Sequence, residues 1–351
     1  MLRIRLNGKG SFYGSKADRD FMKSIDEKIA EAEAEWRSYR YKNAGVRESA
    51  GLLFRAVLRS AGKRMNCAVR NIFPVNICPV NICPVRKRVK LHPSYDKAKV
   101  NMVVSLTSTG DRIKYILPTL YSLASQTRKP DLIVLWLGKD KAYPKGVLSK
   151  IREMGILIRF REDLGPNTKY YYAFNEYCND MVITVDDDII YHKDMTEELY
   201  RAYLKHPEAV TARRVHKIRF DRNRKPVRYK DWIWEYRDAV SPTHDLFATG
   251  VGGVLYPPAV MSYICRESKD FLKVCPKADD IWLKFCELKN GIRVFAVPDA
   301  GFHKDSVNLR TLKTSLAEKN IDRGRNDRYL RSCSQYFGFK DDLCERILGE
   351  L

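Results

Sequence analysis

The sequence lacks any long apolar run and any segment that resembles a secretion signal. No stretch approaches the roughly 20 consecutive apolar residues that a membrane-spanning helix needs. The opening residues, MLRIRLNGKGSFYG, contain no apolar core of a signal peptide. We therefore expect a protein that is soluble, or that makes peripheral contact with an anionic membrane at its inner face.

Cysteine pairs are also lacking. The nine cysteines are odd in number and irregular in spacing, and no CxxC pair occurs. Cys78 and Cys83 are the closest pair, and no matching His or Cys pair follows at the spacing of a zinc site. This usage argues against a zinc module and indicates a reducing compartment, so the expected location is cytoplasmic.

The composition is that of a globular protein, but the charge is strongly positive. Hydrophobic residues make up 44% and charged residues 30%, so the chain can bury a sizeable core and is not a disordered tail. The formal net charge is +21, from 64 Lys and Arg against 43 Asp and Glu. Such an excess favours an anionic partner, namely nucleic acid, an acidic membrane surface or a phosphorylated substrate, unless it is only a solvated basic surface.

Four parts are predicted along the chain. Apolar residues at roughly helical spacing in residues 17–41 predict a helical N-terminal appendage over residues 1–70. The tandem pentapeptides of NIFPVNICPVNICPV follow, and prolines five residues apart exclude a helix or a central strand. With the basic cluster RKRVK this run predicts a linker over residues 71–99. A regular core over residues 100–308 and a polar helical extension over residues 309–351 complete the chain.

Strands and helices alternate in the core, which predicts an α/β fold with parallel βαβ units. In such sheets, ligands bind outside the carboxyl ends of the strands, so polar residues just after a strand are candidate site residues. The expected strands are residues 101–108, 131–137, 155–160 and 181–185, and the expected helices are residues 111–126, 144–154 and 167–177.

Three aspartates, Asp186, Asp187 and Asp188, directly follow the fourth apolar strand. In an extended segment, alternate side chains share a face, so Asp186 and Asp188 are expected on the same side. Two carboxylates on one side suit a hard divalent cation, Mn²⁺ or Mg²⁺, that also binds substrate phosphates. The alternative is an acidic turn that caps the next helix, although Asp194 is better placed as that cap.

Four segments of the core resemble bacterial glycosyltransferases of the GT-A fold, including family 2-like enzymes of surface polysaccharide biosynthesis. These segments are VVSLTS, LPTLYSLASQTRKPDLIVLWL, EDLGPNTKYYYAF and VITVDDDIIY, and the resemblance extends from Asn101 to about Asn308. The triplet DDD resembles the DXD motif of that fold. The resemblance implies a GT-A, Rossmann-like, mostly parallel sheet flanked by helices, and a metal-dependent enzyme that uses a nucleotide-sugar donor.

By position, the resemblance implies roles for residues around the donor. Asp188 would hold the metal that bridges the donor diphosphate, and Asp186 would share the metal or face the ribose. Asp163 would accept from the base, and Lys169 would pair with phosphate; otherwise Asp163 is a turn residue and Lys169 a solvated lysine. The full expected donor set is Thr107, Ser108, Arg112, Asp163, Lys169, Asp186 and Asp187.

The second half of the core offers acceptor and sugar contacts. Residues 212–237 mix many basic residues with Trp and Tyr, which suits an acceptor glycan, a plain hairpin with a charged outer face, or single-stranded nucleic acid. The glycines of ATGVGGVLYPP resemble the strand beneath the donor sugar in GT-A enzymes, or else form a bulged strand.

Acids at the start of a helix over residues 277–291 are the candidate catalytic groups. The resemblance implies that Asp280 is the base that accepts the proton of the attacking hydroxyl, with Asp279 orienting the acceptor. The simpler reading is that both acids complement the positive end of the helix dipole. His303 follows the last core strand and is the expected third metal ligand, alongside Asp186 and Asp188, unless it is structural.

The expected function is therefore transfer of a hexosyl unit, with inversion, from a nucleotide sugar to a hydroxyl of a glycan or lipid-linked glycan, with Mn²⁺ or Mg²⁺ as cofactor. If transfer retains configuration, the acid pair only positions substrate. Two other classes stay open: a nucleotidyl or phosphoryl transferase, and a non-catalytic nucleic-acid-binding protein. The second of these leaves the aspartate triplet unexplained, so no nucleic acid is expected as a partner.

Overall fold

A computed structural model of the chain describes residues 93–264, 269–307, 324–340 and 342–349. The chain divides into two compact units, residues 1–72 and 73–351, and all of the described residues belong to the second. The helical appendage predicted for residues 1–70 and most of the predicted linker lie outside the described residues.

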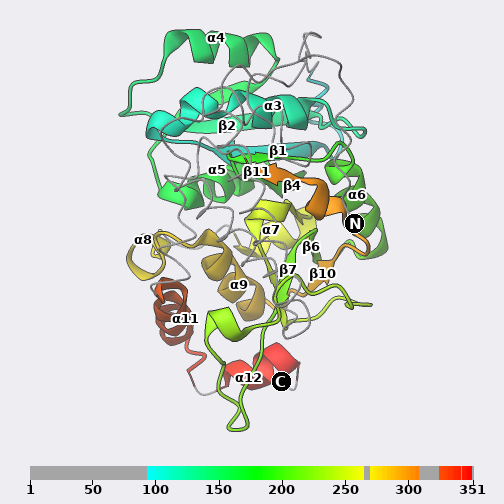
Figure 1. Ribbon diagram of the computed structural model, residues 1–351, viewed down its shortest axis with the longest axis vertical. Coiled ribbons are helices and arrows are strands. Elements are labelled where there is room, and N and C mark those ends of the chain that lie inside the picture. Colours follow the sequence, from blue (N-terminus) through cyan, green and yellow to red (C-terminus); the bar gives the residue numbers. More distant parts are fainter. Residues whose placement is uncertain (1–92, 265–268, 308–323, 341, 350–351) are drawn as a thin grey trace, which may run out of the picture. The chain divides into compact units, whose positions relative to one another are not determined.

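A seven-stranded sheet forms the centre of the second unit, with the strand order β10-β6-β9-β4-β1-β2-β3 (Figure 1). All neighbouring strands are parallel except β9, which is antiparallel to both β4 and β6. The mostly parallel sheet predicted from the sequence is therefore present. Its strands are β1 (Met102–Thr107), β2 (Leu132–Gly138), β3 (Leu157–Arg161), β4 (Met181–Thr184), β6 (Val210–Ala212), β9 (Val254–Tyr256) and β10 (Val294–Ala296).

Helices cover both faces of the sheet because the central strands are apolar on both sides. In β1, Val103 packs into one core cluster, while Val104 and Leu106 pack into the other. The first cluster includes α5 and α9, and the second includes α3 and α6 (Figure 1). The helices are α3 (Leu117–Ala124), α4 (Lys145–Glu153), α5 (Thr168–Glu176), α6 (Met195–Lys205), α7 (Pro258–Ile264), α8 (Phe271–Val274), α9 (Asp279–Lys289), α11 (Arg325–Tyr336) and α12 (Leu343–Leu348).

One predicted helix is divided in the structure. The segment predicted as one helix over residues 111–126 forms a 3-10 helix, η2 (Gly110–Tyr115), and then α3. Pro118 lies in the first turn of α3, where its missing N–H has no helical partner to lose, and a proline there favours a new helix start. Asp194 does occupy the N-cap position of α6, but its side chain makes no capping bond and accepts from Thr127 Oγ1 at 2.9 Å.

Two short antiparallel pairs lie beside the main sheet. β5 (Ile189–Ile190) pairs with β11 (Ser306–Val307), so the chain after the last core strand returns next to the aspartate triplet. β7 (Val215–Lys217) pairs with β8 (Leu246–Ala248). The glycine segment is a 3-10 turn, η5 (Gly250–Gly252), between β8 and β9 and not a continuous strand.

The C-terminal helices contact the core. α11 packs against α8 and α9, and Cys333 of α11 is fully buried in the same cluster as Trp282 of α9. The two C-terminal helices, α11 and α12, fall within the helical extension expected over residues 309–351. Within the described residues, no helix combines the length and the apolarity required to cross a membrane.

Candidate active site

The aspartate triplet lies where the carboxyl ends of β1 and β4 meet. Asp187 and Asp188 form a turn between β4 and β5, so the segment does not stay extended as the sequence predicted. The turn is closed by the Asp186 backbone N–H, which donates to the Tyr191 hydroxyl at 2.9 Å. Thr119 of α3 donates to the Asp187 carbonyl at 3.1 Å, so the turn is held from outside as well.

Two residues that follow β1 contact this turn directly. Ser108 Oγ donates to Asp187 Oδ2 at 2.5 Å, and Arg112 Nε donates to the same oxygen at 3.1 Å. Arg112 Nη2 forms a second contact with Asp187 Oδ1, and lies 3.0 Å from Asp188 Oδ2. The structure therefore brings Ser108 and Arg112 to the triplet, and their expected contact with the nucleotide stays a prediction. Arg112 links two of the three carboxylates.

Lys169, in the first turn of α5, lies among the remaining acids. Its Nζ is 2.6 Å from Asp186 Oδ1 and 3.0 Å from Asp279 Oδ2, and the lysine side chain is only 6% exposed. In the structure Lys169 contacts carboxylates from the segment after β4 and from α9, and the phosphate contact that the sequence predicted for it stays a prediction. Ser105 Oγ fixes the start of α5 by donating to the Lys169 carbonyl at 2.5 Å, and Trp136 Nε1 donates to that hydroxyl at 2.8 Å.

Gly250 joins the two acid groups at close range. Its backbone N–H donates to Asp280 Oδ1 at 3.1 Å. A Cβ atom built on Gly250 would lie 2.9 Å from Lys169 Nζ, 3.3 Å from Asp280 Oδ1 and 3.5 Å from Asp186 Oδ1. The absence of a side chain at this position therefore allows the triplet, Lys169 and the acids of α9 to meet. The glycine signal in the sequence has a physical explanation in this packing.

The charges of this cluster shift one another's pKa values. Burial alone would lower the pKa of Lys169, but Asp186, Asp279 and Asp280 together raise it well above its usual value. Burial and the neighbouring Asp279 charge raise the pKa of Asp280 well above that of an ordinary aspartate. Burial and the nearby Asp186 charge raise the pKa of Asp188 to about 6, although Arg112 opposes the shift. Crowded carboxylates with raised pKa values are typical of functional sites.

Asp163 lies at the same edge of the sheet, beyond β3. Its carboxylate forms an ion pair with Lys141 and accepts from the Gly165 backbone N–H at 2.9 Å. Burial would raise the pKa of Asp163, but the Lys141 and Gly165 hydrogen bonds lower it overall. Thr109 Oγ1 lies 3.5 Å from Asp163 Oδ2, so this group faces the loop after β1. The role of Asp163 as an acceptor for the donor base stays a prediction.

Two predicted residues are placed differently from the rest. Thr107 donates to the Trp136 carbonyl at 3.0 Å, a contact between β1 and β2 within the sheet. His303 lies in the 3-10 helix η6 (Gly301–Lys304), just before β11. Among the residues that the structure describes, no group of three or more His, Cys, Asp or Glu side chains is arranged to hold a metal ion. His303 as a third ligand stays a prediction.

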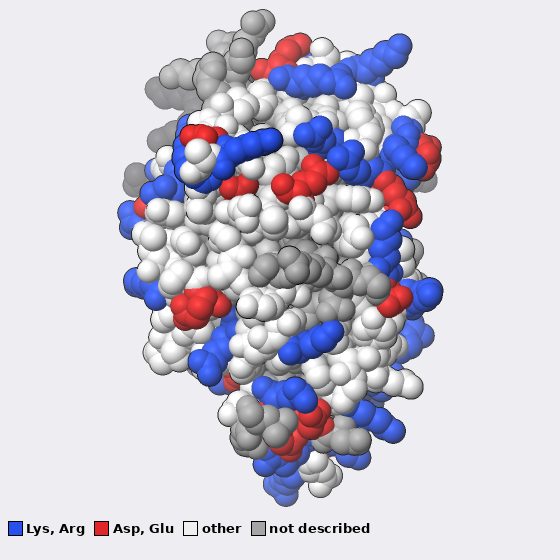
Figure 2. Space-filling model, turned by 180° about the vertical axis from the view of Figure 1, so that it is seen from behind, with Lys and Arg blue, Asp and Glu red and all other residues white. Residues whose placement is uncertain are grey.

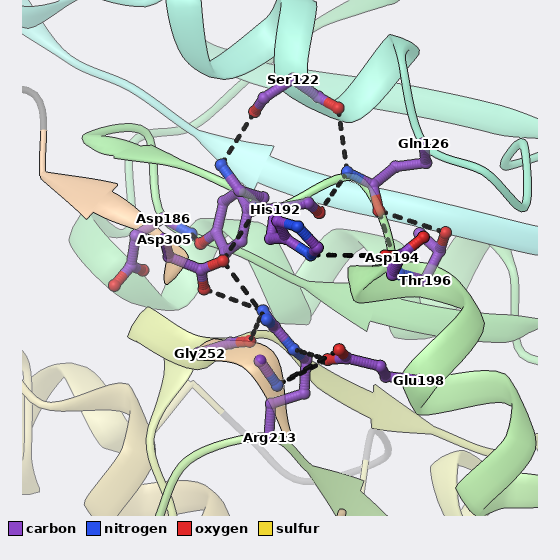
Figure 3. A network of polar contacts seen from close by, with 12 residues as sticks. Ser122, Gln126, Asp186, His192, Asp194, Thr196, Glu198, Arg213, Gly252 and Asp305 are labelled. Carbon is purple, nitrogen blue, oxygen red and sulfur yellow. Dashed lines mark hydrogen bonds and ion pairs between the residues drawn. The ribbon is translucent and has the colours of Figure 1, made fainter. Parts of the chain in front are cut away.

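A buried arginine supports this edge and was missed in the sequence. Arg213, which follows β6, is completely buried, and its Nε lies 2.6 Å from Glu198 Oε2 (Figure 3). Its Nη1 lies 2.8 Å from Asp305 Oδ2 and donates to the Gly252 carbonyl at 3.0 Å. Asp305 also accepts from the His192 backbone N–H at 2.8 Å. Arg213 thus connects α6, the glycine turn and the β5–β11 pair. Only its place in the basic run 212–237 marked it in the sequence.

Residues 107–259 match the family model described as Glycosyl transferase family 2. No curated protein sequence matches the chain at a significant level.

Several solved structures are similar at low identity. TarS from S. aureus, residues 1–349 in complex with UDP, is 18% identical, with 56% of this chain and 58% of that chain covered and a TM-score of 0.39. A mannosyltransferase from Pyrobaculum calidifontis, in complex with GDP-Man and Mn²⁺, is 13% identical, covers 72% and 77%, and has a TM-score of 0.39. Glucosyl-3-phosphoglycerate synthase from Mycobacterium tuberculosis is 14% identical, covers 35% and 50%, and has a TM-score of 0.27. The chain thus spans less than two thirds of the TarS chain.

The family match falls on the segment that carries the aspartate triplet, Lys169 and the glycine turn. Residues 107–259 are therefore similar to a family 2 glycosyltransferase domain, and they contribute strands β2, β3, β4, β6 and β9 of the mostly parallel sheet that the sequence predicted. This match agrees with the resemblance to family 2-like glycosyltransferases that the sequence predicted.

Proposed function

We propose that this protein transfers a sugar from a nucleotide-sugar donor to a hydroxyl group of a glycan or lipid-linked glycan, with inversion and with the help of Mn²⁺ or Mg²⁺. The observation that carries the proposal is the Lys169 cluster. It places the aspartate that follows β4 and the acid pair of α9 around one ammonium group, across Gly250. Direct displacement at an anomeric carbon requires that an acid that binds the donor and an acid that accepts the proton of the acceptor hydroxyl lie close together.

Asp186 and Asp188 fit a divalent cation chemically. Both offer carboxylate oxygens, which hard cations prefer, and both are partly exposed, at 32% and 20%. The raised pKa of Asp188 shows that burial and a like charge oppose its ionisation, and a cation would relieve that opposition. The bound cation would supply Lewis-acid stabilisation of the diphosphate leaving group. In this proposal Arg112 and Lys169 orient the two carboxylates, and His303 is the candidate third ligand.

Asp280 is the proposed general base. The acceptor hydroxyl would lose its proton to Asp280 as its oxygen bonds to the anomeric carbon, and the bond from that carbon to the donor diphosphate would break. The raised pKa of Asp280, which burial and Asp279 cause, makes its carboxylate a stronger proton acceptor than a solvent-exposed aspartate. Asp279, which lies 3.0 Å from Lys169 Nζ, is proposed to orient the acceptor.

The test is donor hydrolysis by the purified full chain. UDP-, GDP-, CMP- and dTDP-sugars would be screened with Mn²⁺ or Mg²⁺, with EDTA, and with Asp188→Ala and His303→Ala. We expect metal-dependent release of nucleoside diphosphate or monophosphate from one donor class, lost in Asp188→Ala. A tenfold or greater rise in the metal concentration needed by His303→Ala would support His303 as a ligand. Release of free pyrophosphate would instead indicate nucleotidyl transfer, and absence of any release or donor binding would overturn the proposal.

A further inference from the structure

In the basic aromatic segment 212–237, backbone hydrogen bonds hold residues 233–236 against β7, next to the proposed reaction centre. Segment 233–236 runs along β7 on the side opposite β8, because Lys217 and Ile233 exchange backbone hydrogen bonds of 2.8 and 3.1 Å. The Tyr236 backbone N–H also donates to the Val215 carbonyl at 3.0 Å. Residues 234 and 235 are therefore held beside the start of β7, where Arg214 lies.

Arg214 touches the glycine turn that contacts the proposed base. Its Nη1 donates to Thr249 Oγ1 at 3.2 Å, and the Thr249 backbone N–H donates to the Arg214 carbonyl at 3.1 Å. Thr249 is followed directly by Gly250, whose N–H donates to Asp280. A Cβ atom on Gly252 would lie 2.7 Å from Arg214 Cβ. The two glycines of the turn thus give close approach to Lys169 on one side and to Arg214 on the other.

Glu235 and Trp234 surround the Arg214 guanidinium. Arg214 Nε donates to Glu235 Oε1 at 3.3 Å, and Arg214 Cζ lies 5.9 Å from the centre of the Trp234 ring. Arg214 and Glu235 are 18% and 21% exposed, and Trp234 is half-buried. An aromatic face beside a paired Arg and Glu offers a stacking surface and several hydrogen-bonding groups, which suits a polyhydroxylated ring.

The backbone at Glu235 is held in an unfavourable conformation. Its φ of 51° lies in the left-handed region, which is uncommon for a residue other than glycine. The conformation is fixed by the Glu235 N–H, which donates to His216 Nδ1 at 3.1 Å. Burial, and then the Arg214 charge, hold the pKa of His216 well below its usual value, so Nδ1 stays available as an acceptor. Unfavourable backbone that its surroundings maintain is concentrated at functional sites.

We propose that Arg214, Trp234 and Glu235 form an acceptor subsite beside the reaction centre, and that this subsite takes a sugar or polyol unit of an anionic glycan. The inference rests on the proposed function, because an acceptor must lie near Asp280. The preference for an anionic chain comes from the segment around the subsite. Residues 213–237 contain ten Lys and Arg against three Asp and Glu, and Arg219, Arg222, Arg228 and Lys230 are exposed.

The excess of positive charge is proportionally greater in segment 213–237 than in the whole chain. On the face shown in Figure 2, Lys and Arg side chains are spread widely and are interspersed with Asp and Glu. Segment 213–237 is more one-sided, and it adjoins the glycine turn through Arg214. A phosphate or a carboxylate on the acceptor would satisfy the same basic side chains, and the probes below separate the two.

The experiment measures direct binding to the full chain, without donor. Three labelled probes of similar length are titrated at low and at moderate salt: a phosphodiester-linked glycerol oligomer, an oligogalacturonate and an uncharged maltooligosaccharide. We expect one of the two anionic probes to bind at least tenfold more tightly than the maltooligosaccharide, with affinity that falls as salt rises. Equal binding of all three probes would overturn the anionic assignment.

Arg214→Met and Trp234→Ala should each weaken the bound anionic probe by roughly tenfold or more, because each removes a direct contact. The matched control is Arg224→Met. Arg224 belongs to the same segment and also has positive φ, but its side chain is 51% exposed and pairs with Glu345 of α12. We expect Arg224→Met to bind within about twofold of the unaltered chain, because exposed ion pairs contribute little.

Equal weakening in Arg224→Met and Arg214→Met would show unspecific charge attraction and overturn the subsite. Melting curves of each variant identify a loss of binding that comes only from unfolding. If Arg214→Met unfolds, Trp234→Ala alone decides, and unchanged binding in a folded Trp234→Ala protein overturns the proposal. Because binding is measured without donor, failure here is distinct from failure of donor hydrolysis, which tests the proposed function.

Discussion

Lys169 Nζ lies 3.0 Å from Asp279 Oδ2, and the two side chains are only 6% and 10% exposed. The same ammonium group contacts Asp186 at 2.6 Å. Lys169→Met would remove the cation that these carboxylates share, at a buried position where water cannot replace it. We expect a loss of about 3 kcal/mol in the free energy of unfolding, measured by urea denaturation, because removing one partner of a buried ion pair is strongly destabilising.

Lys169→Arg is the control for this change, since it keeps the positive charge with a different shape. It should recover part of the lost stability. If the free energy of unfolding of Lys169→Met lies within about 1 kcal/mol of that of the unaltered protein, the carboxylates do not depend on Lys169 for their ionisation. The inference that Lys169 holds the acid cluster together would then be wrong.

Gly250 tests the packing that joins the two acid groups. In Gly250→Ala the new Cβ would lie 2.9 Å from Lys169 Nζ and 3.3 Å from Asp280 Oδ1, so at least one of these side chains must move. We expect sugar transfer to fall by at least tenfold, because a displacement of about 1 Å at a reaction centre has large effects on rate. The measurement is the initial rate on the donor identified by the screen.

A second glycine provides the comparison for that substitution. Gly146 lies in the first turn of α4, and a Cβ built there would meet nothing within 4 Å. Gly146→Ala should leave the transfer rate unchanged and raise the free energy of unfolding by up to about 1 kcal/mol, because alanine is the better helix former. A similar loss of rate in both variants would mean that the effect at Gly250 is not local.

Asp280 can be tested with its structural hydrogen bond kept in place. Asp280→Asn retains an oxygen that can accept the Gly250 N–H, whereas Asp280→Ala removes both this bond and the proposed base. We expect both variants to lose transfer by at least about a hundredfold. Donor binding, measured by calorimetry, should persist in Asp280→Asn. Near-normal transfer by the Asn variant would show that Asp280 is not the base.

The strands and the edge of the sheet that carries the candidate site were predictable because they depend on local pattern. Apolar runs separated by helical periodicity fixed the order of β1 to β4, and polar residues after strands fixed the edge where Ser108, Arg112 and the triplet meet. The division of residues 111–126 at Pro118 was missed, although proline in a first helical turn is a recognised local signal.

Long-range contacts account for what the sequence did not predict. The phosphate contact expected of Lys169 stays a prediction, but its two acid neighbours were not foreseen, because Asp186 lies in the segment after β4 and Asp279 lies in α9, more than a hundred residues away. Arg213 resembled its basic neighbours in sequence, yet its side chain is fully buried while that of Arg201 is 75% exposed. No periodic pattern distinguishes a buried arginine from a solvated one, because burial depends on which elements pack around it.

Glu287 gives a prediction about pH. It is buried in α9 beside Lys284, at 3.3 Å, and burial raises its pKa to about 7 although Lys284 opposes the shift. The folded state therefore binds this proton more tightly than the unfolded chain, whose glutamate titrates near 4.5. The associated stability is present below pH 4.5 and is lost as pH rises through 7, by up to about 3 kcal/mol.

Glu287→Gln removes that titration and keeps the shape of the side chain. Its free energy of unfolding should change less with pH between 4.5 and 7 than that of the unaltered protein, as measured by urea denaturation at several pH values. An identical slope in both proteins would show that Glu287 does not titrate in this range.

Arg213 tests whether the edge of the site depends on a buried ionic network. Its side chain is fully buried between Glu198 and Asp305, which join α6 to the segment that enters β11. Arg213→Met would leave both acids without their cation, so we expect a loss of about 3 kcal/mol or more in the free energy of unfolding. Arg201→Met is the matched control, because Arg201 pairs with Glu197 on the same helix but is 75% exposed, and its loss should cost no more than about 0.5 kcal/mol. Equal small effects in the two variants would mean that the network in Figure 3 is not needed to hold the β5–β11 pair beside the aspartate triplet.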